Sequence, residues 1–192
     1  MNLIREAFPG DLPVIRDLAH AIWPTAYGSI LSPAQLAYML DLIYSLPALE
    51  RQMDEGQRFL LLESEGAAAG FAGFGPLPAG GSGTLPAGGS GILPSADSGP
   101  SSPSGTYKLH KLYVLPTEHG KGRGRLLLEQ VIEICRALEA STLLLNVNRN
   151  NKARHFYERM GFRVVREEDI PIGQRYYMND YIMEYILSSS GS

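Results

Sequence analysis

The first fifty residues carry apolar positions every three or four residues, which is the spacing of one helical face. A helix is predicted after Asp11, its expected cap, and it should end at Trp23-Pro24 because a residue before proline avoids helical backbone angles. A second helix is predicted from Ser32, with Gln35 completing a capping-box pattern. The apolar faces of these two helices contain Leu12, Ile15, Leu18, Ala19, Ile22, Leu36, Met39, Leu40 and Ile43.

Short apolar runs and further helical spacing predict the rest of the fold. The run Leu143–Leu145 is apolar throughout, as expected for a strand covered on both faces. Gly161 fits the left-handed position that closes a helix. Strands that alternate with helices predict an α/β fold with a mixed sheet. We expect strands at 2–7, 58–63, 67–74, 107–115, 142–148, 162–167 and 181–187, and helices at 49–54, 126–139 and 151–160.

Residues 75–105 interrupt this pattern, because they are almost wholly Gly, Pro, Ser, Ala and Leu. The heptapeptide LPAGGSG at 77–83 recurs at 85–91. Such a segment has too few apolar side chains to offset the entropy lost on ordering. We therefore expect a single domain over residues 1–192 with a flexible insertion at 75–105 between two strands of one sheet. A lid over a site and a docking segment for a partner are the two functional alternatives for this insertion.

Composition and charge exclude several classes of protein. Of the 192 residues, 44% are apolar and 19% charged, which indicates a globular chain with a sizeable core. The net charge of −3 argues against a nucleic-acid partner. The single cysteine, Cys135, excludes an internal disulfide and is expected to be a buried core thiol. With no membrane-length apolar run, signal-peptide pattern or metal-ligand spacing, we expect a cytoplasmic protein without membrane contact or metal.

The turn His119–Gly124 places three glycines between a strand and an amphipathic helix. Backbone N–H groups at a helix start bind anions, and glycine lets a ligand approach the backbone closely. Residues 108–125 carry five Lys or Arg against one Glu. The turn lacks the Gly-Lys-Ser/Thr of a Walker A loop and the glycine spacing of a dinucleotide fingerprint. A pyrophosphate therefore suits this turn, and a glycine-rich turn without a ligand is the alternative.

Two motifs resemble the GNAT superfamily of N-acetyltransferases. The first is the strand Leu112–Val114 followed by His119–Gly124, where the family has Gln/Arg-x-x-Gly-x-Gly/Ala. The second begins at Asn148 and ends in Phe-Tyr-Glu-Arg-Met-Gly-Phe at 156–162. His119 departs from the family pattern, which has Gln or Arg there. The resemblance implies a central, mostly antiparallel sheet flanked by helices, and the transfer of an acetyl group from acetyl-coenzyme A (acetyl-CoA) to a primary amine.

The resemblance also implies how acetyl-CoA is held. Backbone groups of Leu112 and Val114 would pair with the pantetheine arm like an added strand, and the amides of residues 120–125 would hold the pyrophosphate. Asn151 would hydrogen-bond the arm, and Phe156 would pack near it. The residues expected to contact this co-substrate are Leu112, Tyr113, Val114, His119, Gly120, Lys121, Gly122, Arg123, Gly124, Arg125, Asn148, Asn151, Ala153 and Phe156.

Acetyl transfer to an amine needs a base for the ammonium and an acid for the departing thiolate. Tyr157 is the candidate acid, because the resemblance places it near the thioester sulfur; the alternative is a core aromatic. His110 is the candidate base, because relatives often carry Glu two residues before the Leu-Tyr-Val stretch. Strand alternation predicts that His110, Leu112 and Val114 share one face. A half-buried histidine without a catalytic part is the alternative.

The acceptor amine is the least specified part of the prediction. Trp23, Tyr27 and Tyr177 are candidate acceptor-binding residues, because aromatic faces attract cations, although packing is their alternative role. Segments 21–53 and 176–184 resemble bacterial GNAT proteins related to polyamine acetyltransferases, which implies a polyamine-like small molecule. Peptide amines, aminoglycosides and amino acids stay open, and relatives are commonly homodimers. A catalytically silent, acetyl-CoA-binding regulatory module is the rival function, and the presence of Tyr157 favours an enzyme over it.

Overall fold

The computed structural model describes residues 2–77 and 105–187. The strands in these ranges are β1 (Asn2–Glu6), β2 (Arg58–Ser64), β3 (Ala67–Pro76), β4 (Thr106–Val114), β5 (Thr142–Asn148), β6 (Arg163–Gly173) and β7 (Tyr176–Ile186). The helices are α1 (Leu12–Tyr27), α2 (Pro33–Tyr44), α3 (Leu46–Asp54), α4 (Arg123–Ala137) and α5 (Ala153–Arg159), with 3-10 turns at Pro9–Asp11 and Pro116–Glu118. None of these helices has the length and apolarity that a membrane crossing requires.

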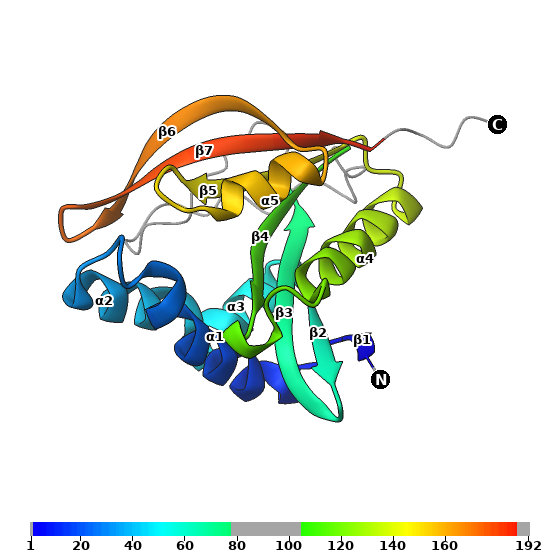
Figure 1. Ribbon diagram of the computed structural model, residues 1–192, viewed down its shortest axis with the longest axis horizontal. Coiled ribbons are helices and arrows are strands. Elements are labelled where there is room, and N and C mark those ends of the chain that lie inside the picture. The colour runs from blue at the N-terminus through cyan, green and yellow to red at the C-terminus, as the bar shows by residue number, and fades with distance from the viewer. Residues whose placement is uncertain (1, 78–104, 188–192) are drawn as a thin grey trace, which may run out of the picture.

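The described strands form one seven-stranded sheet in the order β1-β2-β3-β4-β5-β7-β6 (Figure 1). Every neighbouring pair is antiparallel except β4 and β5, which are parallel. The expected mixed, mostly antiparallel sheet flanked by helices is therefore confirmed. That residues 1–192 form a single domain stays a prediction.

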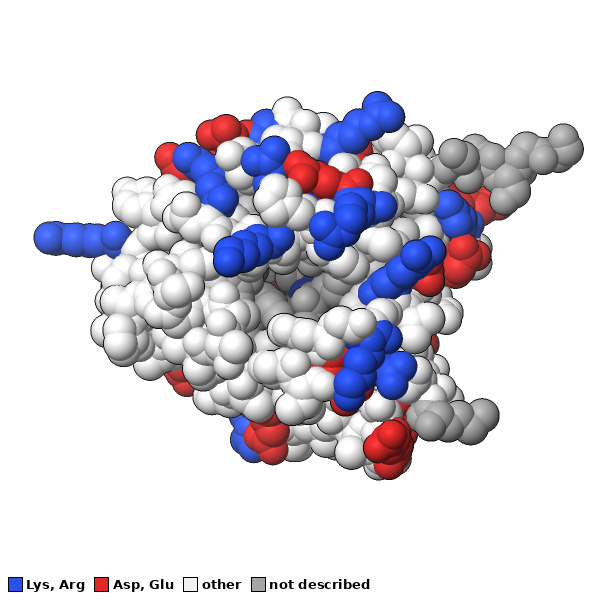
Figure 2. Space-filling view, in the orientation of Figure 1, with Lys and Arg blue, Asp and Glu red and all other residues white. Residues whose placement is uncertain are grey.

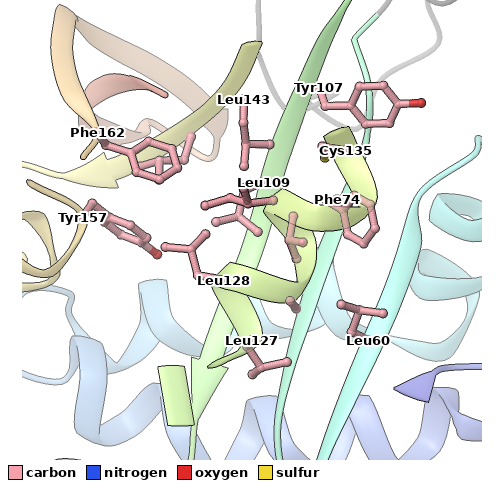
Figure 3. Close-up of a cluster of buried hydrophobic side chains, with 14 of the residues drawn as sticks. Leu60, Phe74, Tyr107, Leu109, Leu127, Leu128, Cys135, Leu143, Tyr157 and Phe162 are labelled. Carbon is pink, nitrogen blue, oxygen red and sulfur yellow. The ribbon is translucent and has the colours of Figure 1, made fainter. Parts of the chain in front are cut away.

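Helices cover both faces of the sheet. Leu60 and Leu62 of β2 pack into one core cluster with α4, whereas Phe59 and Leu61 pack into a second cluster with α1, α2 and α3. Successive side chains of a strand point to opposite faces, so the two clusters lie on opposite sides of the sheet. Figure 3 shows the cluster on the α4 side, which includes the buried thiol of Cys135, as expected.

The strands β4 and β5 pair at one end only. Thr106–Leu109 pairs with 142–145, and the rest of β4 pairs with β3 alone. A β-bulge lies at His110, because Leu109 pairs with Phe74 and Lys111 with Gly73, which leaves His110 without a partner. Beyond the bulge β4 and β5 separate (Figure 1). One backbone edge of β4 is therefore left without a neighbouring strand over residues 110–114.

The first helix begins after Asp11, as predicted, but its end and the role of the Asp11 side chain differ from the prediction. α1 continues through Pro24 to Tyr27, although Trp23-Pro24 was expected to end it. Trp23 and Tyr27 both pack in the aromatic cluster below β4, and this burial outweighs the local preference of the residue before proline. Asp11 does not cap the helix with its side chain; its carboxylate accepts from the Arg5 guanidinium instead. At α2 the expected cap is confirmed, because Ser32 Oγ accepts from the backbone N–H of Gln35 at 3.2 Å.

The last two strands are longer than predicted. They form a hairpin whose turn residues Gln174 and Arg175 have positive φ angles of 49° and 64°. Residues 163–169 of β6 are mostly exposed, and buried residues alternate with exposed ones only at Ile170 and Ile172 near its end. The predicted strand therefore stopped at 167, before this short alternation. Ile170 and Ile172 are buried against the second core cluster, and Tyr38 Oη donates to the Ile172 carbonyl at 2.9 Å. Contacts with α2 therefore stabilise the part of the hairpin that lies beyond the two predicted strands, 162–167 and 181–187.

Smaller differences concern element ends. α4 begins three residues before the expected 126, and α5 is shorter than the expected 151–160. Gly75 and Pro76, expected in the insertion, are the last residues of β3, and the Leu77 N–H donates to the Thr106 carbonyl at 3.0 Å. The remainder of the predicted flexible insertion, 78–104, lies outside the described residues. Gly161 has the expected left-handed φ, at 96°.

Candidate active site

A cavity of about 1030 Å³ lies where β4 separates from β5. Its walls come from α1, β4, the turn before α4, β5 and α5. Figure 2 shows the hollow at the centre of this face, with Lys and Arg side chains around it. The predicted site residues that line it are Tyr27, His110, Leu112, Tyr113, Val114, His119, Gly120, Gly122, Arg123, Gly124, Arg125, Asn151, Ala153, Phe156 and Tyr157. Trp23, Lys121, Asn148 and Tyr177 are predicted residues outside this lining.

The glycine turn enters α4 through a left-handed residue. Gly122 is the N-cap of α4 with φ 75°, and Gly120 has φ 77°. A Cβ at either position would meet nothing within 4 Å, so backbone conformation rather than space requires glycine here. The first N–H groups of a helix have no acceptor within the helix. The turn therefore presents backbone donors beside the cavity, where they can bind an anion.

We expect that Gly122→Val weakens acetyl-CoA binding about tenfold, because a β-branched side chain disfavours positive φ and would displace the backbone donors. Gly122→Asn is the matched control, since Asn adopts the left-handed region more readily and should lose much less affinity. Calorimetric titration of both variants with acetyl-CoA measures the difference. Equal affinity in the valine variant and the wild type would contradict a role for this backbone conformation.

The basic side chains of the turn differ in their hydrogen-bond partners and in whether they line the cavity. Glu118 accepts from Lys121 Nζ at 2.9 Å and from Arg123 Nε at 3.2 Å, and these bonds lower the pKa of the Glu118 carboxyl. Glu118 and Arg123 line the cavity, whereas Lys121 does not. His119 Nε2 lies 3.1 Å from the Val114 carbonyl, which ties the turn to the end of β4. The cavity wall keeps Arg123 and Arg125 as its cations in this turn.

Tyr157 lies on α5 at the inner end of the cavity. Its ring is 8% exposed and packs between Phe156 and Phe162, with ring centroids 5.2 and 5.8 Å away. Figure 3 shows its hydroxyl directed away from Phe162. Burial, followed by the neighbouring Tyr27, raises the pKa of Tyr157 far above its ordinary value. The phenol is therefore protonated at neutral pH and able to donate a proton.

His110 lines the same cavity from the bulge of β4. The bulge breaks the expected alternation, since Leu109 and Leu112, three residues apart, pack in the same cluster. Because the bulge lies at His110, the two-residue spacing of His110 and Leu112 no longer predicts that they share a face. Burial, followed by the charges of Lys111 and Lys108, holds the pKa of His110 well below its ordinary value. The imidazole is neutral at physiological pH.

The predicted acceptor-binding residues occupy three different environments. Tyr27 lines the cavity, and its hydroxyl lies 3.0 Å from that of Tyr113. Trp23 is 2% exposed and packs behind this pair, with its ring 4.6 Å from Tyr27 and 6.0 Å from Tyr113. Tyr177 is 53% exposed near the hairpin turn. The structure thus brings Tyr27 to the cavity and leaves Trp23 as support for it.

Four polar residues near the gap were not among the predicted site residues, although Asp180 lies in the segment 176–184 that carries the polyamine resemblance. Lys108, Lys111 and Asp180 are buried, and Asn146 lines the cavity from β5. Burial lowers the pKa of Lys108 to about 8 and that of Lys111 to about 7, and it raises the pKa of Asp180 to about 6. The available signal was the placement of charged residues at the interior of strands that are otherwise apolar. No group of His, Cys, Asp and Glu within the described ranges could hold a metal ion.

The chain is similar to known proteins in both sequence and fold. Residues 15–162 match the acetyltransferase (GNAT) family. Over 77 residues the chain is 34% identical to an uncharacterized N-acetyltransferase of Mycobacterium tuberculosis, covering 40% of this chain and 49% of the relative. Over 69 residues it is 36% identical to the ribosomal protein bS18 alanine N-acetyltransferase of Haemophilus influenzae, covering 36% and 44%. The chain thus spans about half the length of the curated relatives it matches.

A solved structure with the same architecture is the PaiA N-acetyltransferase from Thermoplasma acidophilum in complex with coenzyme A. It superposes with a TM-score of 0.72 at 21% identity, over 97% of this chain and 99% of that one. At this identity the likeness shows a shared fold. Because the family match covers most of the sequence, including both motifs and the cavity they line, the chain belongs to the acetyltransferase (GNAT) family.

Proposed function

We propose that this protein transfers the acetyl group of acetyl-CoA to a primary amine. The observation that carries the proposal is the convergence of three features on one cavity: the open edge of β4, the donor turn before α4, and the protonated Tyr157. Membership of the family supports it, as does the coenzyme A bound in the PaiA relative. The residues present fit this co-substrate, because a strand edge and a backbone anion site lie in the order that an extended arm with a pyrophosphate requires.

The co-substrate would lie along the turn and β4. Backbone N–H groups of residues 120–125 would bind the pyrophosphate, with Arg123 and Arg125 adding positive charge. The free edge of β4 at Leu112–Val114 would pair with the pantetheine amides. Asn151 and Phe156 line the cavity beside this path. This arrangement directs the thioester toward the gap between β4 and β5.

The chemistry then needs two proton transfers. The amine nitrogen attacks the thioester carbonyl, the carbon–sulfur bond breaks, and the sulfur receives a proton from Tyr157. His110, neutral at physiological pH, takes the proton that the amine loses. Both side chains line the cavity, His110 on β4 and Tyr157 on α5. At neutral pH Tyr157 carries the proton that an acid needs, and His110 is neutral, as a base must be.

We expect His110→Gln to lower kcat by about a hundredfold, the lower end of what a general base contributes. A base must be neutral, so the wild-type rate should fall as the pH drops through the pKa of His110, which lies well below 6.5. This acid limb in kcat should be absent in the variant. An unchanged pH profile of kcat would assign the base elsewhere.

The proposed activity is tested by calorimetry with acetyl-CoA followed by thiol release with a panel of amines. The panel contains spermidine, because segments 21–53 and 176–184 resemble polyamine acetyltransferases. It also contains a peptide with an N-terminal alanine, because one relative is a ribosomal-protein alanine N-acetyltransferase. Binding with thiol release supports the enzyme and identifies the acceptor class. Binding without release from any amine supports the silent regulatory module instead. Absence of binding would overturn the proposal.

A further inference from the structure

The buried carboxylate of Asp180 has no role in the chemistry described so far. Asp180 is on β7, opposite Asn148 of β5, and is 1% exposed. Its Oδ2 accepts from Asn146 Nδ2 at 3.3 Å, whereas its Oδ1 has no hydrogen-bond partner. An unpaired oxygen of a buried carboxylate is costly, and such groups are concentrated at functional sites.

Asn146 connects Asp180 to the cavity. It lies on β5 in the wall of the cavity, and Tyr27, another wall residue, is close enough to feel the charge of Asp180. A carboxylate only accepts hydrogen bonds, so Asp180 turns the N–H₂ end of the Asn146 amide toward itself. The carbonyl end of that amide, Asn146 Oδ1, is then left to accept a bond from a donor in the cavity.

We propose that Asn146, oriented by Asp180, forms a subsite that binds a second, non-reacting cationic group of the acceptor. The inference rests on the proposed acetyltransferase function and names its substrate class: amines that carry another positive charge a few bonds from the reactive nitrogen. Asn146 Oδ1 accepts the N–H of that cation, and Asp180 supplies the negative charge behind it. The reacting nitrogen itself must lose its proton, so an anion beside it would oppose the reaction. A neighbouring cation has no such requirement.

Besides burial, charged neighbours shift the pKa of the Asp180 carboxyl in both directions, since Lys108 and Arg149 lower it and Glu168 raises it. Lys108 on β4, Arg149 after β5, Glu168 on β6 and Tyr27 on α1 interact electrostatically with Asp180. Burial, as the largest influence, raises the pKa of Asp180 to about 6, so the carboxylate is charged at neutral pH. As the pH falls through about 6, Asp180 becomes protonated and the acceptor KM should rise. Protonation of Asp180 should change the acceptor KM, whereas protonation of His110 should change kcat, so the two pH effects can be told apart.

The test uses acceptors matched in length that differ in the charge of the far end. Butane-1,4-diamine, butylamine and 4-aminobutanoate are compared by thiol release, together with the peptides Ala-Lys and Ala-Glu. In the wild type we expect the cationic member of each set to have the lowest KM. Asp180→Asn should raise the KM of the cationic acceptors about tenfold and reduce the differences within each set, because a charge-assisted bond is lost. The KM for acetyl-CoA should stay unchanged.

Three further variants complete the test. Asn146→Ala should raise the KM of the cationic acceptors, as Asp180→Asn does. The double variant should raise this KM little further, because the two residues act as a unit. Glu184→Gln is the matched control: it removes a carboxylate of the same strand, β7, that neither lines the cavity nor acts on Asp180, and it should leave the acceptor ranking unchanged. Thermal melting shows whether each variant folds; if Asp180→Asn does not, the wild-type ranking and Asn146→Ala decide.

The outcomes separate this inference from the proposed function. Thiol release with an unchanged ranking in both Asp180→Asn and Asn146→Ala would overturn the subsite and leave the acetyltransferase intact. An equal effect of Glu184→Gln would assign the ranking to general electrostatics and also overturn the subsite. Release from none of the acceptors, with no binding of acetyl-CoA, would overturn the proposed function and this inference together.

Discussion

Tyr157→Phe is expected to lower kcat about a hundredfold, the lower end of what a general acid contributes. The substitution removes one oxygen and keeps the ring that packs between Phe156 and Phe162. Affinity for acetyl-CoA should therefore stay within about twofold, because no binding group is lost. Stopped assays of thiol release give kcat, and calorimetry gives the affinity.

A hydroxyl outside the cavity provides the matched control for this experiment. Tyr185 contacts the same core cluster as Tyr157, but its hydroxyl accepts from Arg136 at 3.1 Å on the surface side. Tyr185→Phe should leave kcat unchanged. A wild-type rate in Tyr157→Phe would assign the proton donor elsewhere, and an equal loss in both variants would point to a packing effect.

The second large effect is expected on stability, at Lys111. This side chain is 4% exposed; its Nζ donates to Gln52 and, at 3.2 Å, to Gln57, and it lies over the rings of Phe59 and Tyr44. Burial lowers its pKa from 10.5 to about 7, so charging it in the folded state is unfavourable. Replacement by Met, of similar volume, should raise the free energy of unfolding at pH 7 by about 2 kcal/mol.

The pH dependence gives the sign of this effect. Between about pH 7 and 10 the unfolded chain binds the Lys111 proton and the folded chain does not, so wild-type stability should rise with pH in this window. The advantage of Lys111→Met should be full below pH 7 and shrink as the pH approaches 10. Urea unfolding at several pH values measures both quantities. Lys152→Met, at an exposed lysine, is the control, and the same gain there would contradict the burial argument.

Local sequence signals determined much of the fold and part of the site. The alternating and helical patterns predicted each strand and helix, because apolar periodicity records which face is buried. The turn at residues 119–124 was predicted as an anion site because glycine and helix-start chemistry are local properties. The cap at Ser32 and the left-handed Gly161 were also predicted correctly, since each depends on neighbours within four residues.

Other features depended on partners far along the chain. α1 passes through Pro24 because Trp23 and Tyr27 pack against β4, and the last hairpin extends because Ile170 and Ile172 are buried near α2. The bulge at His110 depends on the register with β3 and changes which residues share a face. Each of these contacts joins residues far apart in the sequence, and the pattern within one segment does not specify its distant partner.

The sequence by itself determined the fold class and the glycine turn, and its second motif identified Tyr157 as the candidate acid. Only the tertiary structure decided that β4 and β5 separate beyond Leu109, which opens the cavity and gives its walls their composition. It alone placed Asp180 of β7 behind Asn146 of β5 and buried Lys111 among aromatic rings. The physical reason is that pKa shifts and hydrogen bonds between strands arise from burial and pairing across long sequence separations, which local patterns do not encode.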